Sequence, residues 1–239
     1  MTEYEQGLQG VNIESFSKEN PPTPTQVVQT ATLYAQVFAG YPWFEVNRCP
    51  NCESYYDQGS SAGDSCTKCD GGIIGPAYPL DKTVTDIVEA LDKPGASMFL
   101  AEFSGQIVGF AWTNLRDTDE YLKRFRSMSP EIGQEVASVL SRDHDLYSLA
   151  EIGVAQDMRG RGIGKELFIR QVASGLKYNL IQTAWTRHDT IIAPICLKSG
   201  FRQVFGPELV LENGRATLTK KDIIGRSPTD PDRVLFIKT

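Results

Sequence analysis

One stretch of this chain, residues 149–168, limits the possible folds more than any other. Its sequence, LAEIGVAQDMRGRGIGKELF, starts as an apolar strand, crosses a polar bend and continues as a helix with Ile163, Leu167 and Phe168 on one face. The bend and the helix start hold three alternating glycines and two arginines: Arg159, Gly160, Arg161, Gly162 and Gly164. Uncovered N–H groups at a helix start bind phosphate, and guanidinium groups beside them strengthen that binding. The stretch therefore predicts a strand–turn–helix unit that holds a multiply charged anion.

Two familiar phosphate-binding patterns do not fit this turn. The dinucleotide-binding fingerprint needs its third glycine in a later position, with an acidic residue about 20 residues on, and the alternating glycines lack that spacing. The P-loop needs Gly-Lys-Ser/Thr, whereas this chain has Gly164-Lys165-Glu166. A plain turn without a ligand is the remaining alternative, although alternating glycines and paired arginines are costly for turning alone.

A third pattern matches in register, and a second motif accompanies it. The pyrophosphate loop of the GNAT superfamily of acetyltransferases reads Arg or Gln, two residues, Gly, one residue, Gly or Ala, after a strand that ends in valine. Arg159, Gly162 and Gly164 match this loop, and Val154 takes the place of the closing valine. Residues 194–201, PICLKSGF, resemble the family's short helix that ends in Gly-Phe. The chain resembles this superfamily over most of its length outside residues 41–79.

The order of the expected elements is also similar to that of the GNAT fold. In the first half we expect a strand at 11–16, two helices that end at Gly40 and before Pro94, a hairpin across Ser104-Gly105, and helices broken at Pro130. In the second half we expect a strand at 146–154, a helix at 162–178, a strand at 180–185, a helix at 190–198 and further strands up to residue 238. The resemblance implies an α/β fold of the mixed α+β kind, whose splayed mixed sheet parts between its fourth and fifth strands and is flanked by helices. We assign residues 1–40 and 80–239 to this acetyltransferase domain and residues 41–79 to an inserted module.

Four of the five cysteines lie in the inserted module, as Cys49-Pro50-Asn51-Cys52 and Cys66-Thr67-Lys68-Cys69. Two CxxC pairs separated by 13 residues have the spacing of a zinc ribbon, because each tight turn brings two thiolates to one metal. Disulfides, redox chemistry and iron are the alternatives, but cytosolic thiols stay reduced and nothing in the sequence indicates secretion. We predict a small zinc ribbon in which these four cysteines hold structural Zn²⁺.

Composition narrows the class of protein and of partner. The chain has 41% hydrophobic and 23% charged residues, as ordinary globular proteins do. The first ten residues are acidic and lack an apolar segment, so we expect no signal peptide and a cytoplasmic location. No apolar run reaches the roughly 18 residues of a membrane helix. The net charge of −6 argues against general nucleic-acid binding and suits a cationic partner, although solubility explains it equally well.

The resemblance implies acetyl-CoA as the cosubstrate. Backbone donors of the glycine loop would anchor its pyrophosphate, and a backbone N–H near Val154 would polarise the thioester carbonyl. The cofactor-binding residues that we expect are Ile152, Val154, Arg159, Gly160, Arg161, Gly162, Ile163 and Gly164.

Acetyl transfer also needs a base that takes the proton of the attacking ammonium group. Our candidate is Glu151, since strand alternation places it, with Gly153, on the face opposite Ile152 and Val154. A solvated or paired carboxylate without a catalytic role is the alternative. Because the base of GNAT enzymes is often a chain of waters, four other polar residues are further candidates: His144, Asp145, His188 and Asp189.

The departing thiolate needs an acid, and here the sequence departs from the family. Counting back from Gly200, the family's usual tyrosine position holds Cys196. A thiol has a pKa near 8.5, so it can serve as that acid. The alternatives are that Cys196 is a small core residue, that water supplies the proton, or that Cys196 carries the acetyl group transiently.

The inserted module lies between the first two helices, a region that borders the acceptor side of the cleft in the resembled family. We expect it to shape the acceptor pocket, with Trp43, Phe44, Tyr55 and Tyr56 as candidate side chains. The alternative is a metal cross-brace for a loop too poor in apolar residues to fold alone.

Three functions compete. The first is an acetyl-CoA-dependent N-acetyltransferase whose acceptor is a primary amine on a small molecule or a protein. The second is a regulatory protein that senses acetyl-CoA and engages a partner through the ribbon, which the missing tyrosine favours. The third is nucleic-acid recognition through the ribbon, which the acidic composition of that module argues against.

Overall fold

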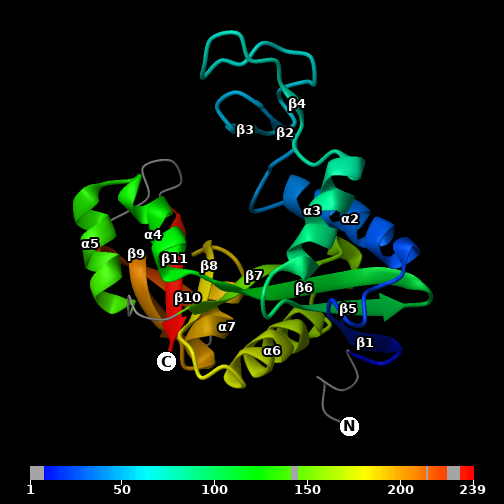
Figure 1. The fold of residues 1–239 in the computed structure, drawn as a ribbon. Helices are drawn as coiled ribbons and strands as arrows, with labels where there is room; N and C mark the ends of the chain where they lie inside the picture. Colours follow the sequence, from blue (N-terminus) through cyan, green and yellow to red (C-terminus); the bar gives the residue numbers. More distant parts are fainter. Residues whose placement is uncertain (1–7, 141–144, 214, 225–231) are drawn as a thin grey trace. The chain divides into compact units, whose positions relative to one another are not determined.

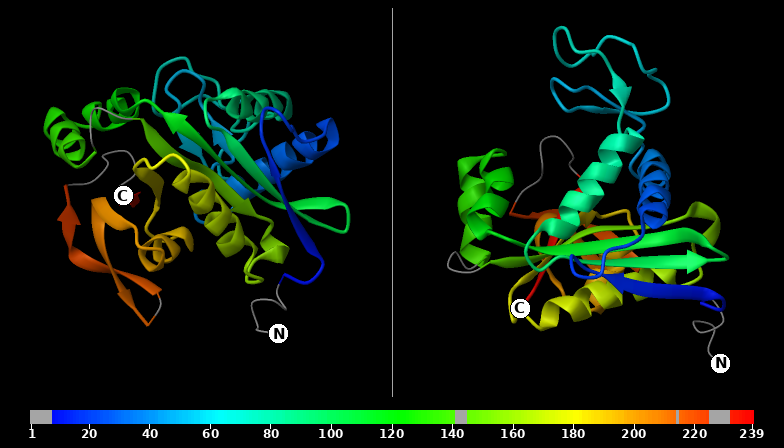
Figure 2. Two further views of the ribbon diagram at one scale, coloured as in Figure 1. Left: turned by 60° about the horizontal axis from the view of Figure 1, so that its bottom comes forward. Right: turned by 45° about the vertical axis from the view of Figure 1, so that its right-hand side comes forward.

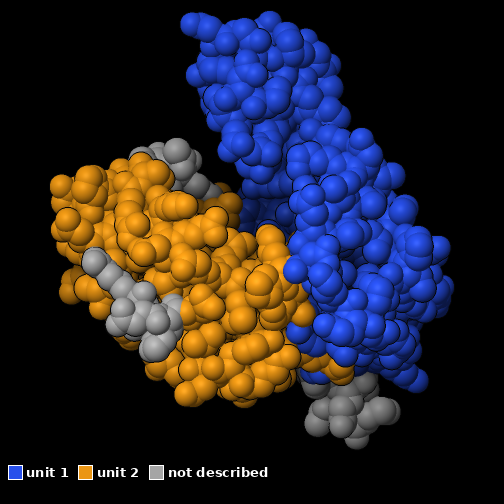
Figure 3. Space-filling view, in the orientation of Figure 1, with its two compact units in different colours: residues 1–92, 97–111, 151–168 blue, residues 93–96, 112–150, 169–239 orange. Residues whose placement is uncertain are grey.

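The computed structural model describes residues 8–140, 145–213, 215–224 and 232–239. The chain divides into two compact units, coloured separately in Figure 3. Unit 1 comprises residues 1–92, 97–111 and 151–168, and unit 2 comprises residues 93–96, 112–150 and 169–239. Two strands and one helix run through both units. Within the described ranges, no helix combines the length and the hydropathy that crossing a membrane requires.

Unit 1 contains one edge of the sheet, in the strand order β1-β5-β6-β7. Its strands are β1 (Val11–Phe16), β5 (Ser97–Phe103), the first part of β6 (Gln106–Arg116) and the last part of β7 (Leu146–Val154). β1 pairs antiparallel with β5, from Val11 opposite Phe103 to Phe16 opposite Met98. The predicted hairpin turn joins β5 to β6, with Ser104 and Gly105 both at positive φ.

Helices cover both faces of this edge. The helices α2 (Pro24–Ala39) and α3 (Leu80–Asp92) pack together on one face, and the start of α6 (Ile163–Leu176) lies on the other (Figure 2). Thr23 begins α2 with a capping box, in which its hydroxyl accepts from the amide of Gln26, an arrangement that contributes about 1 kcal/mol. Gly40 ends α2, as the sequence predicts.

The segment between α2 and α3 forms a sheet of its own. Its two-residue strands, β2 (Asn47–Arg48), β3 (Tyr55–Tyr56) and β4 (Gly75–Pro76), pair in the order β3-β2-β4. Both pairings are antiparallel, and the strands protrude beyond the ends of α2 and α3 (Figure 1). The boundary of this module at residues 41–79 stays a prediction.

Unit 2 contains the rest of the sheet, in the order β6-β7-β8-β11-β9-β10. The added strands are β8 (Gln182–Arg187), β9 (Arg202–Glu212), β10 (Arg215–Ile223) and β11 (Arg233–Lys238). The parallel pairing of β7 with β8 runs only from Tyr147 opposite Gln182 to Leu149 opposite Ala184, and the strands part after it. β11 inserts between β8 and β9 and is antiparallel to both.

The core of unit 2 is aromatic and aliphatic. Its helices are α4 (Thr118–Arg126), α5 (Pro130–Val139), the end of α6 and α7 (Ile192–Lys198). Phe125 of α4 packs edge-on against the rings of Trp185 and Phe205, with centroids 5.3 and 5.5 Å away. The predicted helix break at Pro130 is confirmed, since Pro130 opens α5 after the Ser129 cap.

The predicted fold class is confirmed: the chain is a mixed α/β protein with a splayed sheet flanked by helices. The expected elements all form within the described residues, with ends shifted by a few positions. For example, β8 starts at Gln182 and not at residue 180, and α6 ends at Leu176. Helix and strand ends depend on local hydrogen bonds that a periodic pattern does not specify.

Candidate functional site

The predicted glycine loop joins β7 to α6 in unit 1. A 3-10 turn, η1 (Gln156–Met158), follows β7, and the chain then passes through Gly160 and Gly162 at φ values of 79° and 85°. Such positive φ values favour glycine. An added Cβ at Gly160 meets no protein atom within 4 Å, so the loop backbone is open at that point.

Four amides of the loop and helix start are uncovered. Among the residues that the structure describes, the N–H groups of Gly160, Gly162, Ile163 and Gly164 have no hydrogen-bond partner. The helical bonding begins only when the amide of Glu166 donates to the carbonyl of Gly162 at 3.0 Å. A helix start with free donors attracts an anion by direct hydrogen bonds and by its dipole.

The two arginines of the loop make different contacts. Nε of Arg159 donates to the carbonyl of Val154 at 3.3 Å, and this side chain is otherwise exposed. The guanidinium of Arg161 lies 5.0 Å from the ring centroid of Phe103, and its Nη2 donates to the carbonyl of Gln9 at 3.4 Å. Arg159 is therefore the freer of the two to meet an anion at the loop.

The end of β7 shows the alternation that the sequence predicts. Ile152 and Val154 are partly buried and pack against the core cluster that contains Ile163. Gly153 faces the opposite side, where an added Cβ would lie 2.4 Å from Cζ of Phe110. Glu151, two residues before Gly153, shares its face.

Glu151 lies among aromatic side chains on that face. Tyr34 of α2 stacks on Phe110, with ring centroids 5.5 Å apart. Burial raises the pKa of the Tyr34 phenol well above its usual value, and the carboxylates of Glu151 and Glu45 raise it further. Glu151 itself is half-buried.

The other candidate bases have different surroundings. His144 lies outside the described residues. In unit 2, Nε2 of His188 lies 3.1 Å from a carboxylate oxygen of Asp232, and Asp189 pairs with Arg187 at 3.1 Å. His188 is thus held by a hydrogen bond and Asp189 by an ion pair. Asp145, the residue before β7, makes no hydrogen bond or ion pair with any described residue.

Cys196 lies on α7 in unit 2 and is fully buried. Burial raises the pKa of its thiol far above the ordinary value, so this thiol stays protonated. Its backbone carbonyl accepts from the amide of Phe201 at 3.0 Å, which fixes the turn at Gly200.

The four cysteines of the CxxC pairs converge in unit 1. Their sulfurs all lie within 4.8 Å of one another, and two contacts measure 3.6 Å, Cys49 to Cys69 and Cys52 to Cys66. A tetrahedral zinc site with Zn–S bonds of about 2.3 Å has sulfurs about 3.8 Å apart, so this arrangement fits the metal. Gly72 closes the cluster, because an added Cβ there would lie 2.4 Å from Sγ of Cys49.

The electrostatics of the thiols also suit a dication. The Tyr56 hydroxyl, 3.0 Å from Sγ of Cys66, lowers the pKa of that thiol to about 6. The neighbouring Cys66 and Cys52 raise the pKa of the Cys69 thiol to about 12. Four thiols this close cannot all ionise without a cation, and a metal that accepts four thiolates removes that conflict.

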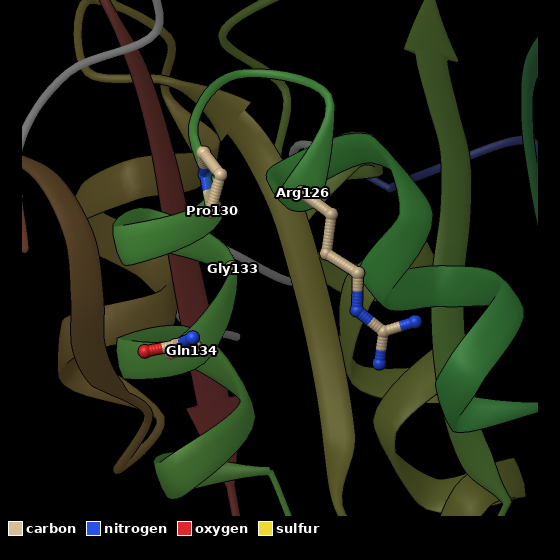
Figure 4. A pocket seen from close by; sticks show the side chains of 4 residues that line it. All are labelled: Arg126, Pro130, Gly133 and Gln134. Carbon is tan, nitrogen blue, oxygen red and sulfur yellow. The ribbon is translucent and has the colours of Figure 1, made fainter.

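A shallow hollow on the α4–α5 hairpin of unit 2 lacks comparable chemistry. Its lining residues are Arg126, Pro130, Gly133 and Gln134 (Figure 4). The one charged side chain, Arg126, pairs with Asp119 at 2.7 Å. The hollow therefore presents neither a nucleophile nor an acid–base pair.

A comparison with known families gives one match. The profile of the Acetyltransferase (GNAT) family matches residues 73–201, more than half of the chain. The match begins just after the fourth cysteine of the ribbon. Among curated proteins, no sequence matches the chain significantly.

Solved structures of similar fold are numerous and distant in sequence. An agmatine N-acetyltransferase is 14% identical, covers 95% of this chain and 98% of its own, and has a TM-score of 0.52. NAA60 from Arabidopsis thaliana, solved in complex with acetyl-CoA, is 12% identical, and the match covers 95% of this chain and 97% of that chain with a TM-score of 0.51. A ribosomal-protein-alanine N-acetyltransferase from Brucella melitensis is 13% identical, and the match covers 95% of this chain and 98% of that chain with a TM-score of 0.50.

Proposed function

The chain belongs to the acetyltransferase (GNAT) family, and from this we propose that it transfers the acetyl group of acetyl-CoA directly to a primary amine. The acceptor is a small molecule or a protein. One observation carries the proposal: the glycine loop presents four uncovered amides, those of Gly160, Gly162, Ile163 and Gly164, beside the exposed Arg159. This is the donor set that a diphosphate requires. The solved relatives, which act on agmatine and on ribosomal-protein alanine, are consistent with an amine acceptor.

Each predicted site residue has a proposed role. The loop amides and Arg159 hold the pyrophosphate, with Arg161 supporting the loop from its contact with Phe103. The backbone of Ile152 and Val154 meets the acetyl-bearing end of the cosubstrate, which supplies the activated acyl group. Their side chains pack against the core cluster beneath the loop.

Two side chains have proposed roles in proton transfer. Glu151 takes the proton of the acceptor ammonium, since it is half-buried and shares a strand with Val154. Cys196 meets the leaving thiolate as the acid, which its protonated thiol supports. Its full burial equally suits a core residue, so the rate of a Cys196 variant distinguishes the two.

We propose that Cys49, Cys52, Cys66 and Cys69 bind structural Zn²⁺, because their sulfur spacing fits a tetrahedral site. Such thiols must stay reduced, which supports a cytoplasmic location. A regulatory protein that only senses acetyl-CoA is the second candidate. Tight binding of acetyl-CoA without thiol release on any amine would favour it.

Two matched glycine variants test the proposal. Gly160 and Gly105 have φ values of 79° and 78°, and neither has a protein atom within 4 Å of an added Cβ. Replacing either by alanine therefore adds the same backbone strain, of about 1–2 kcal/mol. Only Gly160→Ala places a methyl group where the diphosphate is expected.

We expect Gly160→Ala to weaken acetyl-CoA binding by about tenfold or more, as loss of hydrogen bonds to a charged group does. Gly105→Ala should keep the wild-type affinity in the same calorimetric titration. Equal affinity for both variants, or no binding to the wild-type protein, would contradict the proposal.

A further inference from the structure

A group of side chains from five separate segments of unit 1 meets on the α2 face. We call it the tyrosine–carboxylate cluster, and its members are Tyr34, Glu45, Tyr55, Tyr78 and Glu151. They come respectively from α2, the segment after α2, the ribbon strand β3, the segment before α3, and β7. All lie within one compact unit.

The ring of Tyr78 contacts the rings of the other two tyrosines. The rings of Tyr34 and Tyr78 meet edge to face, with centroids 5.0 Å apart. The ring centroid of Tyr55 lies 6.2 Å from that of Tyr78. Tyr55 is 38% exposed, whereas Tyr34 and Tyr78 are half-buried, so the cluster is open to solvent at the ribbon. The face of an aromatic ring attracts an organic cation, and the exposed Tyr55 offers such a face at the open side of the cluster.

Glu45 is the most buried carboxylate of the cluster, with only 9% of its surface exposed. The hydroxyl of Tyr78 donates a very short hydrogen bond to its Oε2. Its backbone amide donates to the carbonyl of Phe38 at 2.8 Å, which fixes the residue against the end of α2. A carboxylate held in a fixed position beside aromatic rings pairs with an organic cation by a charge-assisted hydrogen bond, while the rings add their own attraction.

Two carboxylates act on the phenols of the cluster. Glu151 and Glu45 raise the pKa of the Tyr34 phenol beyond the effect of burial. Burial and then Glu45 raise the pKa of Tyr78, so both phenols stay neutral hydrogen-bond donors at physiological pH. A basic group does lie nearby, since the guanidinium of Arg48 is 5.4 Å from the Tyr55 ring centroid. Arg48 is paired with the exposed Glu53 at 3.0 Å.

We propose that the tyrosine–carboxylate cluster binds a second cationic group of the acceptor, the one that does not react. Glu45 pairs with this group, and the rings of Tyr34, Tyr55 and Tyr78 surround it. The proposal rests on the proposed function, in which Glu151 serves the reacting nitrogen. Two carboxylates for two cationic nitrogens define the acceptor class as a diamine or a similar dication.

Two amines that differ by one charge test this inference. 1,4-Diaminobutane keeps an ammonium group when its other nitrogen is deprotonated, whereas 1-aminobutane does not. With wild-type protein and saturating acetyl-CoA, we expect kcat/KM for the diamine to exceed that for the monoamine by about 10- to 100-fold. Glu45→Gln, which keeps the size and an acceptor for Tyr78, should abolish that preference and leave the monoamine within about twofold.

Glu53→Gln is the matched control, because it removes the same charge from an exposed position of the same module. It should keep the preference for the diamine. Equal kcat/KM values for the two amines in wild-type protein, or a Glu45→Gln variant that retains the preference, would overturn the inference while the transfer activity itself stands.

A binding measurement keeps the inference testable if neither amine reacts. Calorimetric titration with 1,4-diaminobutane should show binding to the wild type and to Glu53→Gln, weakened about tenfold or more in Glu45→Gln. If Glu45→Gln does not fold, Tyr55→Leu, at a 38% exposed position, should weaken diamine binding instead. Wild-type affinity in the variants, or no binding of the diamine to the wild type, would refute it.

Discussion

The glycine loop and the tyrosine–carboxylate cluster lie in the same unit but are built in different ways. The loop is one continuous segment, residues 159–164, and it acts through backbone amides. The cluster gathers side chains from five segments, and its Glu45–Tyr78 contact joins residues 33 positions apart. We therefore expect the loop to keep its conformation when other segments are altered, whereas the cluster depends on the path of the whole inserted module.

Metal removal should have the largest effect and should separate the two regions. A chelator, or Cys49→Ser, should unfold the ribbon and abolish the preference for a diamine, because Tyr55 is carried by β3 next to the thiols. Structural zinc contributes on the order of 10 kcal/mol to such modules. Acetyl-CoA affinity, followed by calorimetry, should stay within about twofold.

The control is restoration of the diamine preference by added Zn²⁺ after chelation. A chelated protein that acetylates the diamine as before would show that the ribbon is only a brace. A chelated protein that loses acetyl-CoA binding would show instead that the loop is not independent of the module.

Substituting the proposed proton-transfer groups should lower the rate without changing the glycine loop. We expect Glu151→Gln to reduce kcat by about 100-fold or more and Cys196→Ala by about tenfold, with acetyl-CoA affinity unchanged. Single-turnover thiol release measures both. A Cys196→Ala variant with wild-type kcat would assign that residue to the core, and a normal rate for Glu151→Gln would assign the base to water.

Gly153→Ala should have the smallest effect and tests the strand that links the two regions. The added Cβ would lie 2.4 Å from the Phe110 ring, so we expect a loss of about 1–3 kcal/mol in unfolding free energy. Thermal unfolding measures this loss, with Gly105→Ala as the control in open space. Displacing Phe110 should also raise KM for the amine, and acetyl-CoA affinity should be kept. Unchanged stability would show that β7 adapts at this point.

What the sequence could predict follows the same division. The strand–turn–helix unit and the CxxC spacing are local patterns, which can be recognised from neighbouring residues alone. The helices and strands that define the fold class are also local patterns, and the predicted fold class is confirmed. The position of β11 between β8 and β9 was not predictable, since strand order depends on packing between distant segments. Within the candidate site, alternation placed Glu151 opposite Val154, but no spacing rule connects it with Tyr34 or Glu45.

The aromatic side chains of the module illustrate this limit. Trp43, Phe44, Tyr55 and Tyr56 are the predicted pocket side chains of the module, and the structure gives them different surroundings. The Trp43 ring packs on Phe38, with centroids 5.4 Å apart, while Phe44 is 48% exposed at a positive φ. Only Tyr55 joins the cluster. Tyr78, which no motif singles out, is its central ring.

The strand β3 consists of two residues whose side chains serve two different chemistries. The Tyr56 hydroxyl reaches a sulfur of the thiol group, while the ring of Tyr55 reaches Tyr78. Because adjacent residues of a strand point to opposite faces, these two residues of β3 present one ring to the thiols and the other to the cluster. On the proposed roles, oxidation of the four thiols would change the selectivity for amines, while acetyl-CoA binding at the glycine loop would be kept.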